Sequence, residues 1–260
     1  MRWLFSIPFL LAGLLFAQSP VVTFFNKTGP NFALDTNGLL AWYKADAEAY
    51  SHNAEVTTWT DQQNAFDLGD LLGAGTHPTF KTNQVNGYPA LSFDGTDDVL
   101  FHNAFNHTGT GITVFVVAAV DEKKNFGVLV CLNDIGATTA KILEMRMDDN
   151  GTNAMMVAAA AAVPVYAANS IVTNAGFKLW VGRRDDTLGT NALIYHPDAE
   201  LSLFESGTSE WYSIGVGGRV AGAATLNLQQ RQAEVAIFGY SMNPVAISNA
   251  VAYFTNKYNL

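Results

Sequence analysis

Short apolar runs separated by turn-forming residues make up most of the chain after its apolar N-terminus. The runs are rich in Val, Ile, Phe, Trp and Tyr, and they are shorter than typical helices. Clusters of Gly, Asn, Asp and Thr stand between them, and these residues favour turns. Examples of the runs are GLLAWYKA, PALSF, ITVFVVAAV, FGVLVCL, FKLWVG and AEVAIFGY. The pattern predicts a domain built of β-strands.

The stretch KILEMRMDDNGTNAMMV is the clearest predicted hairpin. Apolar and charged residues alternate in its first half, as in a strand with one buried face. The dipeptide Asn150-Gly151 that follows is typical of a type I′ turn. Asn86-Gly87, in NGYPALSF, is a further tight-turn signal.

One helix is predicted, at the C-terminal end of the chain. Ile247, Val251 and Phe254 recur at helical spacing, and either Ser241 or Asn243 suits the N-terminal cap. The proline after Asn243 fits a first helical turn. Many strands and one short terminal helix predict an all-β fold, a two-sheet antiparallel sandwich with jelly-roll topology.

The N-terminus has the pattern of a secretory signal peptide. Arg2 precedes a continuous apolar run over residues 3–16, and small Ala17 precedes polar residues. The run is short for a membrane span, although an uncleaved anchor is the alternative. We therefore expect a signal peptide over 1–17, an extension over 18–35 and one domain over 36–260, secreted or displayed at the cell surface. We expect no stable membrane span once the leader is removed.

Composition limits the classes of partner and the covalent chemistry. The chain has 260 residues, of which 49% are hydrophobic and 14% charged, and its net charge is −9. It lacks the basic surface that nucleic acid requires, so no nucleic-acid partner is expected. Cys131 is the only cysteine, which excludes an internal disulfide and favours a buried side chain. Asn26, Asn106 and Asn150 begin Asn-x-Thr triplets, which matter only in a host that glycosylates them.

Six stretches together resemble domains of a known superfamily. They are LLAWYKADA at 39–47, VTTWTDQ at 56–62, HPTF at 77–80, NGYPALSFDGTDDVL at 86–100, AEVAIFGYSM at 233–242 and VAYFTNKYNL at 251–260. In this order they resemble bacterial and viral domains of the concanavalin A-like lectin/glucanase superfamily, close to laminin-G-like modules. The resemblance implies an exported jelly-roll sandwich used for glycan binding or adhesion.

The residues that carry the resemblance are expected to be structural. As in the superfamily, they occupy core and turn positions: Trp42, Trp59, Asp61, Phe93, Asp94 and Gly95. One departure is Gln63-Asn64, where relatives tend to have Ser-Gly, so we expect a different turn there. Ligand sites of the superfamily lie in variable loops, and a shared fold does not assign an activity.

Asp94, Asp97 and Asp98 form the densest acidic cluster. Three carboxylates this close together are part of what a calcium ion requires, and calcium is common in the resembled superfamily. Asp-Gly is also an ordinary turn dipeptide, and the spacing does not match a twelve-residue calcium loop. We favour solvated turn residues over a metal site. We expect no required cofactor; calcium is the one ion that the pattern allows.

A glucanase site would need acids at alternate positions of one strand. The nearest match is Glu144, Arg146 and Asp148, in which an arginine replaces the middle acid and would lower the pKa of Glu144. We favour an exposed salt bridge there. The motifs GxSxG, HExxH and the P-loop are also absent from the sequence. We expect no enzymatic activity.

Sugar binding needs a flat aromatic face flanked by hydrogen-bonding groups. Trp180 is a candidate, because alternation places it opposite the apolar residues Phe177, Leu179 and Val181. Trp211 and Tyr212, in SEWYS, are the other candidates. For each of the three, burial is the competing interpretation.

Three functions compete. The leading one is a secreted or surface-displayed, non-catalytic lectin-type domain that binds a glycan or cell-surface polysaccharide, or acts in adhesion. The second is a structural subunit of a surface layer, filament or virion, in which the alanine-rich run MMVAAAAAVPVYAA would support self-association. The third is a glycan hydrolase or lyase whose acids follow another pattern.

Overall fold

The computed structural model describes most of the chain from residue 33 onwards. The described residues are 33–69, 77–105, 107–122, 124–133, 143–147, 153–158, 165–170, 176–185, 187, 190–195, 201–204, 213–218, 220–221, 223–224 and 226–260. Of these, residues 133, 153–158, 165–170, 190–195, 201–204, 220–221 and 223–224 are described by their backbone alone. The expected signal peptide, most of the expected extension, and Asn26, Asn106 and Asn150 lie outside the described residues.

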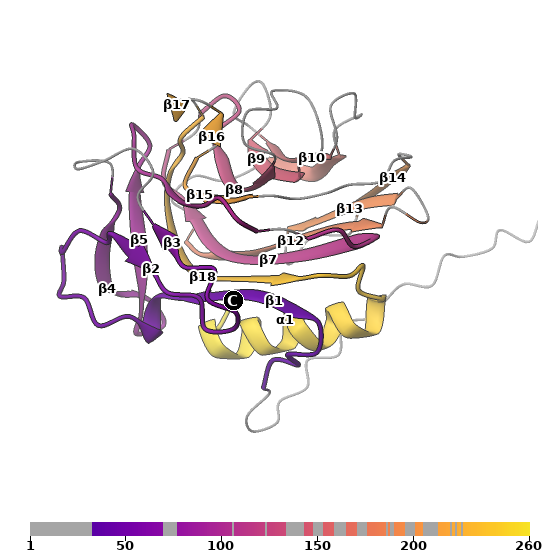
Figure 1. Ribbon diagram of the computed structural model, residues 1–260, viewed down its shortest axis with the longest axis horizontal. Helices are drawn as coiled ribbons and strands as arrows, with labels where there is room; N and C mark the ends of the chain where they lie inside the picture. The colour runs from indigo at the N-terminus through magenta and orange to yellow at the C-terminus, as the bar shows by residue number, and fades with distance from the viewer. Residues whose placement is uncertain are drawn as a thin grey trace, which may run out of the picture.

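Two antiparallel sheets lie face to face, with one helix below them (Figure 1). The first sheet has the order β14 (Leu201–Phe204), β13 (Thr190–Tyr195), β12 (Lys178–Asp185), β7 (Gly111–Val120), β18 (Gln229–Phe238), β5 (Tyr88–Asp94) and β4 (Thr79–Val85), and β1 (Leu39–Lys44) also pairs with β18. The second has the order β11 (Val165–Ser170), β10 (Asn153–Ala158), β9 (Leu143–Met147), β8 (Val128–Asn133), β15 (Ser213–Val216), β6 (Leu100–His102), β3 (Leu68–Gly69) and β2 (Thr58–Trp59). The small pair β16 (Val220–Ala221) and β17 (Ala223–Ala224) and the short helix η1 (Ala45–Ala47) complete the fold with α1 (Pro244–Tyr258). The predicted two-sheet β-sandwich with a terminal helix is confirmed.

The chain passes repeatedly from one sheet to the other. It runs from β5 in the first sheet to β6 in the second, back to β7 and again to β8. The predicted hairpin is present, because β9 pairs with β10. The predicted tight turn at Asn86-Gly87 joins β4 to β5, which also pair as a hairpin. In the β4–β5 turn, Asn86 and Gly87 have positive φ angles of 45° and 84°, as a type I′ turn requires.

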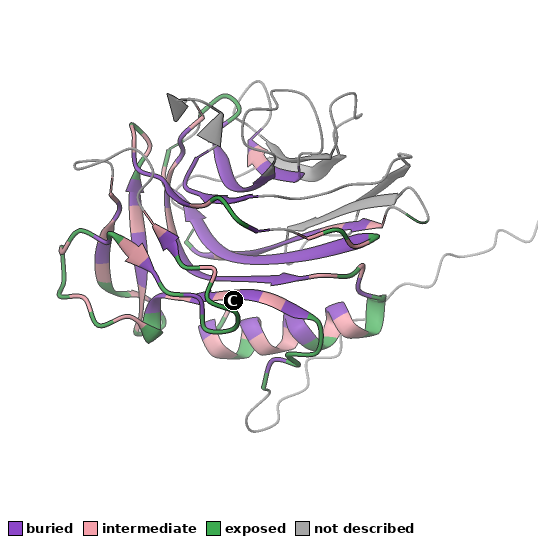
Figure 2. Cartoon of the chain, viewed as in Figure 1, coloured by how far each residue is buried: buried purple, intermediate pink, exposed green. Residues whose placement is uncertain are grey.

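β7 is a central strand that is buried on both faces, as the purple ribbon in Figure 2 shows. Val114 and Val116 face the core between the sheets, whereas Phe115 and Val117 belong to a second apolar cluster beneath α1. A strand covered on both sides loses the alternation of polar and apolar residues, which explains the continuous run GITVFVVAAV.

α1 lies against the outer face of the first sheet (Figure 1). Asn243 is its N-terminal cap and accepts a hydrogen bond from the backbone N–H of Ala246 at 2.9 Å, so the predicted start is confirmed. The three residues predicted at helical spacing, Ile247, Val251 and Phe254, are all buried. The Phe254 ring stacks on that of Phe115, with centroids 5.4 Å apart. Within the described residues, no helix is long and apolar enough to cross a membrane.

Asp61 organises the loop that contains the departure Gln63-Asn64. Its buried carboxylate accepts four backbone N–H groups at 2.8–3.1 Å, from Trp42, Gln63, Asn64 and Phe66. Asn64 donates to the carbonyl of Leu40 at 2.8 Å and so joins the loop to β1. Trp59 and Phe93 are core residues, as predicted, and Gly95 lies in the turn that follows Asp94, the last residue of β5. Asp61 pairs with Tyr43 in an isolated β-bridge, and Trp42, on β1, is half-buried.

Candidate functional site

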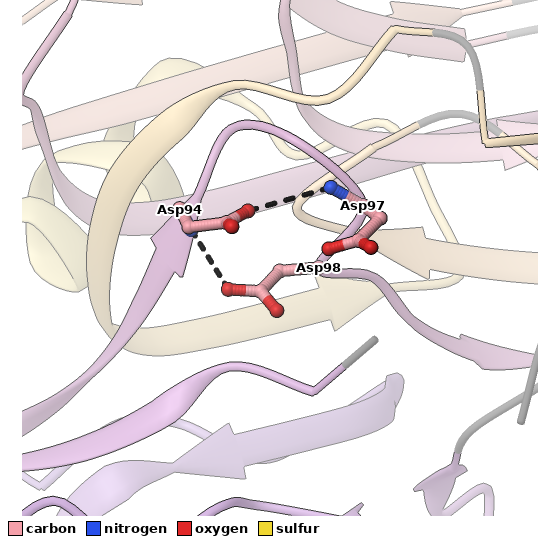
Figure 3. Close-up of side chains that lie close together, drawn as sticks. All are labelled: Asp94, Asp97 and Asp98. Carbon is pink, nitrogen blue, oxygen red and sulfur yellow. Dashed lines mark hydrogen bonds between the residues drawn. The ribbon is translucent and has the colours of Figure 1, made fainter. Parts of the chain in front are cut away.

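The three aspartates lie together in the loop that leads from β5 to β6 (Figure 3). One carboxylate oxygen from each can be chosen so that the three atoms lie within 4.8 Å of one another. Asp94 Oδ1 accepts the backbone N–H groups of Thr96 at 2.7 Å and Asp97 at 3.4 Å. Asp98 Oδ2 accepts the N–H of Asp94 at 2.7 Å. Two of the carboxylates therefore hold the turn, as predicted.

Two neighbouring segments fasten this loop. Lys124, between β7 and β8, donates from Nζ to the carbonyl oxygen of Gly95 at 2.6 Å. Asn227, just before β18, donates from Nδ2 to the carbonyl oxygen of Thr96 at 2.7 Å. Gly95 has a φ of +76°, and a Cβ there would lie 2.6 Å from the backbone nitrogen of Gln229, so only glycine fits.

A small cleft of about 300 Å³ opens between these segments. It is lined by Asp94, Gly95, Thr96, Glu122, Lys124 and Gln229. Two acidic side chains and one lysine give it a polar surface, and none of its described lining residues is aromatic. The arrangement suits a small polar ligand or a cation better than the face of a sugar ring.

Asp98 differs from the solvated residue that we predicted, because it is buried with 6% of its surface exposed. Burial, together with the negative charges of Asp94 and Asp97, raises its pKa to about 7. The hydrogen bond from the N–H of Asp94 and the nearby His77 oppose this rise. Near neutral pH both the protonated and the ionised form of this carboxyl group are therefore populated.

The prediction that Trp180 is an exposed sugar platform is wrong. Its side chain is 1% exposed and belongs to the core between the two sheets. Phe177, Leu179 and Val181 are buried, as predicted, but beneath α1. Because β12 is covered on both faces, the indole has no free face for a ligand. Trp211 and Tyr212 lie outside the described residues.

The predicted ion pair between Glu144 and Arg146 exists, but it is not exposed. Arg146 Nη1 lies 2.7 Å from Glu144 Oε2, and Glu144 is completely buried. Cys131 Sγ lies 3.7 Å from Glu144 Oε1 and is buried as predicted. Asp148, the third residue of the set compared with a glucanase site, lies outside the described residues.

A second, larger cleft was not predicted from the sequence. It has a volume of about 650 Å³ and lies where α1 begins, between residues 33–35, the link from Tyr240 to Asn243, and the first turns of the helix. Tyr240 is the one aromatic residue among its described lining residues. The signal that could have found it is an aromatic residue just after a strand and just before a helix cap.

The same fold occurs in solved structures of proteins that interact with sugars. Domain 4 of AbnA, a GH43 extracellular arabinanase from Geobacillus stearothermophilus, was solved with arabinotriose; the TM-score is 0.59 at 10% identity, over 82% of this chain and 97% of that domain. Trypanosoma rangeli sialidase in complex with sialic acid gives 0.58 at 15% identity, over 86% of this chain and 34% of that one. The ligand binding domain of botulinum neurotoxin serotype D, with N-acetylneuraminic acid, gives 0.52 at 10% identity, over 81% and 51%.

These likenesses establish a shared fold. The chain spans about a third of the length of the sialidases that it matches. No protein-family model matches the chain, and no curated protein sequence does.

Proposed function

We propose that this chain is an exported, non-catalytic binding domain of the concanavalin A-like type that binds a glycan, at a cell surface or in adhesion. One observation carries the proposal. Domain 4 of the arabinanase, which was solved with arabinotriose, matches this chain over 97% of its length. A neurotoxin ligand binding domain solved with N-acetylneuraminic acid has the same fold. The superfamily resemblance of six sequence stretches supports the same function independently.

A glycan array tests the proposal. The secreted chain is applied to neutral and acidic glycans and to polysaccharides, in the presence of calcium and in the presence of a chelator. We expect binding to a defined set of glycans and no release of reducing sugar from any bound polysaccharide. A chain that binds none of them under either condition contradicts the proposal. Hydrolysis that is abolished by Glu144→Gln would favour the alternative of a glycan hydrolase.

We also propose calcium as an ion of the β5–β6 loop, held by Asp94, Asp97 and Asp98. The support is that one oxygen from each of the three lies within 4.8 Å of the others. Carboxylate oxygens are ligands that calcium prefers, although it needs six to eight ligands and carbonyl groups or water would supply the rest. The ion would stiffen a loop that borders the smaller cleft.

Calorimetry with calcium chloride tests this ion site. Asp97→Asn is the variant of choice, because no described hydrogen bond depends on the Asp97 carboxylate. We expect it to weaken calcium binding about tenfold or more, since it removes one charged ligand. Glu122→Gln, which removes one charge from the lining of the same cleft, is the control and should change the affinity little. Equal effects of the two variants would contradict a specific site.

A further inference from the structure

Exposed apolar side chains line the larger cleft, at the start of α1. The described part of the chain has three large hydrophobic residues with substantial exposure: Phe126, Tyr240 and Val245. Two of them, Tyr240 at 36% and Val245 at 71%, line this cleft. Figure 2 shows the first turn of the helix as exposed. Exposed apolar side chains that gather in a hollow are typical of a binding site.

Tyr240 is held in place by the surrounding fold. A Cβ on Gly38, which has a φ of +73°, would lie 2.6 Å from Tyr240 Cε1, so the ring lies directly against the glycine backbone. The ring also meets Phe238 edge to face, with centroids 6.2 Å apart. Thr113 Oγ1 donates to the carbonyl oxygen of Tyr240 at 2.9 Å and accepts the N–H of Met242 at 3.0 Å. A ring fixed in this way loses little conformational entropy when a ligand packs on it.

The polar groups of the cleft offer both donors and acceptors. Asp35 uses Oδ1 to accept the N–H of Asn37 at 3.0 Å, and its Oδ2 makes no hydrogen bond within the described residues. Asn243 uses Oδ1 for its cap, and its NH₂ group likewise has no hydrogen-bond acceptor among them. Among the described residues, the side chains of Asn249 and Tyr240 make no polar contact through their amide and hydroxyl groups. Burial and the negative charge of Asp35 raise the pKa of the Tyr240 hydroxyl, so the hydroxyl remains a protonated donor.

Charge distinguishes between classes of ligand. Asp35 is the only ionised side chain among the described residues that line the cleft; there is no lysine, arginine or histidine. A carboxylate ligand would therefore meet a like charge and no cationic partner. The positive end of α1 would favour an anion, but the cap Asn243 already satisfies the N–H of Ala246. Neutral sugar hydroxyl groups can donate hydrogen bonds to the Asp35 carboxylate and accept them from the amide groups of Asn243 and Asn249.

We propose that this cleft, which we call the α1 cleft, binds a neutral sugar residue, with its apolar face on the Tyr240 ring and its hydroxyl groups on Asp35 and Asn249. The inference rests on the proposed function, because it assigns a site and a sugar class to the glycan. It places the site away from the three aspartates of the β5–β6 loop. It also favours neutral sugars, such as the arabinotriose of the arabinanase domain, over N-acetylneuraminic acid.

Paired asparagine variants of the full secreted chain test the site. Asn249 and Asn256 are both exposed and lie two turns apart on α1, but only Asn249 lines the cleft. The ligands are arabinotriose and the neutral glycan that gives the strongest array signal. We expect Asn249→Ala to weaken the affinity about three- to tenfold, the usual effect of one lost hydrogen bond. Asn256→Ala should leave the affinity unchanged.

A second pair of measurements tests the class of sugar. N-acetylneuraminic acid should bind the unaltered chain more weakly than the neutral glycan. Asp35→Asn removes the only charge among the described lining residues, so it should reduce the difference in affinity between N-acetylneuraminic acid and the neutral glycan. Circular dichroism of every variant confirms that the fold is intact before affinities are compared.

The outcomes separate the inference from the proposed function. If neutral glycans bind but Asn249→Ala and Asn256→Ala behave alike, the α1 cleft is not the site, although the domain still binds glycans. If only acidic glycans bind, the assignment of a neutral sugar is wrong. If no glycan binds, the proposed function fails together with the inference.

Discussion

Carboxylates illustrate how differently one residue type behaves in this molecule. The Asp61 carboxylate accepts hydrogen bonds from four backbone N–H groups, one on β1 and three in the loop after β2. Asp98 accepts one such group and crowds against two other acids. Like charges close together destabilise the ionised form of a carboxyl group, and burial adds to this at Asp98, whose pKa is raised.

Asp98 makes the stability of the fold depend on pH. Its pKa is about 7 in the folded chain, against an ordinary value of 3.8, so the unfolded chain ionises first as the pH rises. The free energy of unfolding should therefore fall between about pH 4 and pH 7 and level off above that range. Asp98→Asn removes the ionisation, while its side-chain oxygen can still accept the N–H of Asp94.

Denaturant unfolding at a series of pH values measures this effect. We expect Asp98→Asn to be more stable than the unaltered chain above pH 7 and to show a flatter dependence below it. Asp35→Asn removes an exposed charge elsewhere and serves as the control. An unchanged pH profile in Asp98→Asn would show that this carboxyl group is not the source.

At the scale of elements, α1 is fastened to the first sheet by a buried carboxylate. Glu234 of β18 is completely buried, and its Oε1 accepts the indole N–H of Trp42 at 2.6 Å and the hydroxyl of Tyr253 at 3.1 Å. Its Oε2 accepts Lys257 Nζ and the hydroxyl of Tyr258, both at 2.7 Å. Burial, followed by the charge of Glu234, raises the pKa of both tyrosines, so their hydroxyls remain protonated donors.

Glu234→Gln should loosen this attachment. The amide carries no charge for Lys257 and turns an NH₂ group toward hydroxyl and ammonium donors. Breaking a buried ion pair costs about 3–5 kcal/mol of the free energy of unfolding. Urea denaturation measures that loss, and hydrogen exchange should rise along α1 first. Glu122→Gln, at an exposed position, should change stability by about 0.5 kcal/mol or less.

Equal hydrogen exchange along α1 in Glu234→Gln and in the unaltered chain would contradict this role for the carboxylate.

The helix itself was predictable from the sequence, because the proline, the cap and the apolar spacing are local signals. Its attachment was not. Trp42 and Glu234 are separated by 192 positions, and a charged residue within the strand AEVAIF does not show what it binds.

At the scale of the whole molecule, the central strands belong to two apolar clusters at once. Val116 of β7 and Trp180 of β12 lie between the sheets, whereas Phe115 and Leu179 of the same strands lie beneath α1. Neither cluster can disperse without disturbing the other. The domain should therefore unfold in one cooperative step.

Two spectroscopic probes test this cooperativity. Tryptophan fluorescence is the first probe, because Trp59 and Trp180 lie in the core between the sheets. Far-ultraviolet circular dichroism, the second probe, reports on the backbone. We expect the two denaturation curves to coincide. Two separate midpoints would show that the sheets or α1 unfold independently.

Size-exclusion chromatography in the same buffer tests self-association. The alternative function, a structural subunit of a surface layer, filament or virion, requires it.

Local pattern by itself determined the strands, the Asn86-Gly87 turn, the capped helix and the burial of Cys131. These depend on backbone preferences and on the spacing of apolar residues, which act over a few positions. Only the tertiary structure decided that Trp180 is buried, that Asp98 is withdrawn from water, and that Tyr240 faces a cleft. The reason is that alternation shows which side chains share a face of a strand, whereas what covers each face depends on residues far away in the chain.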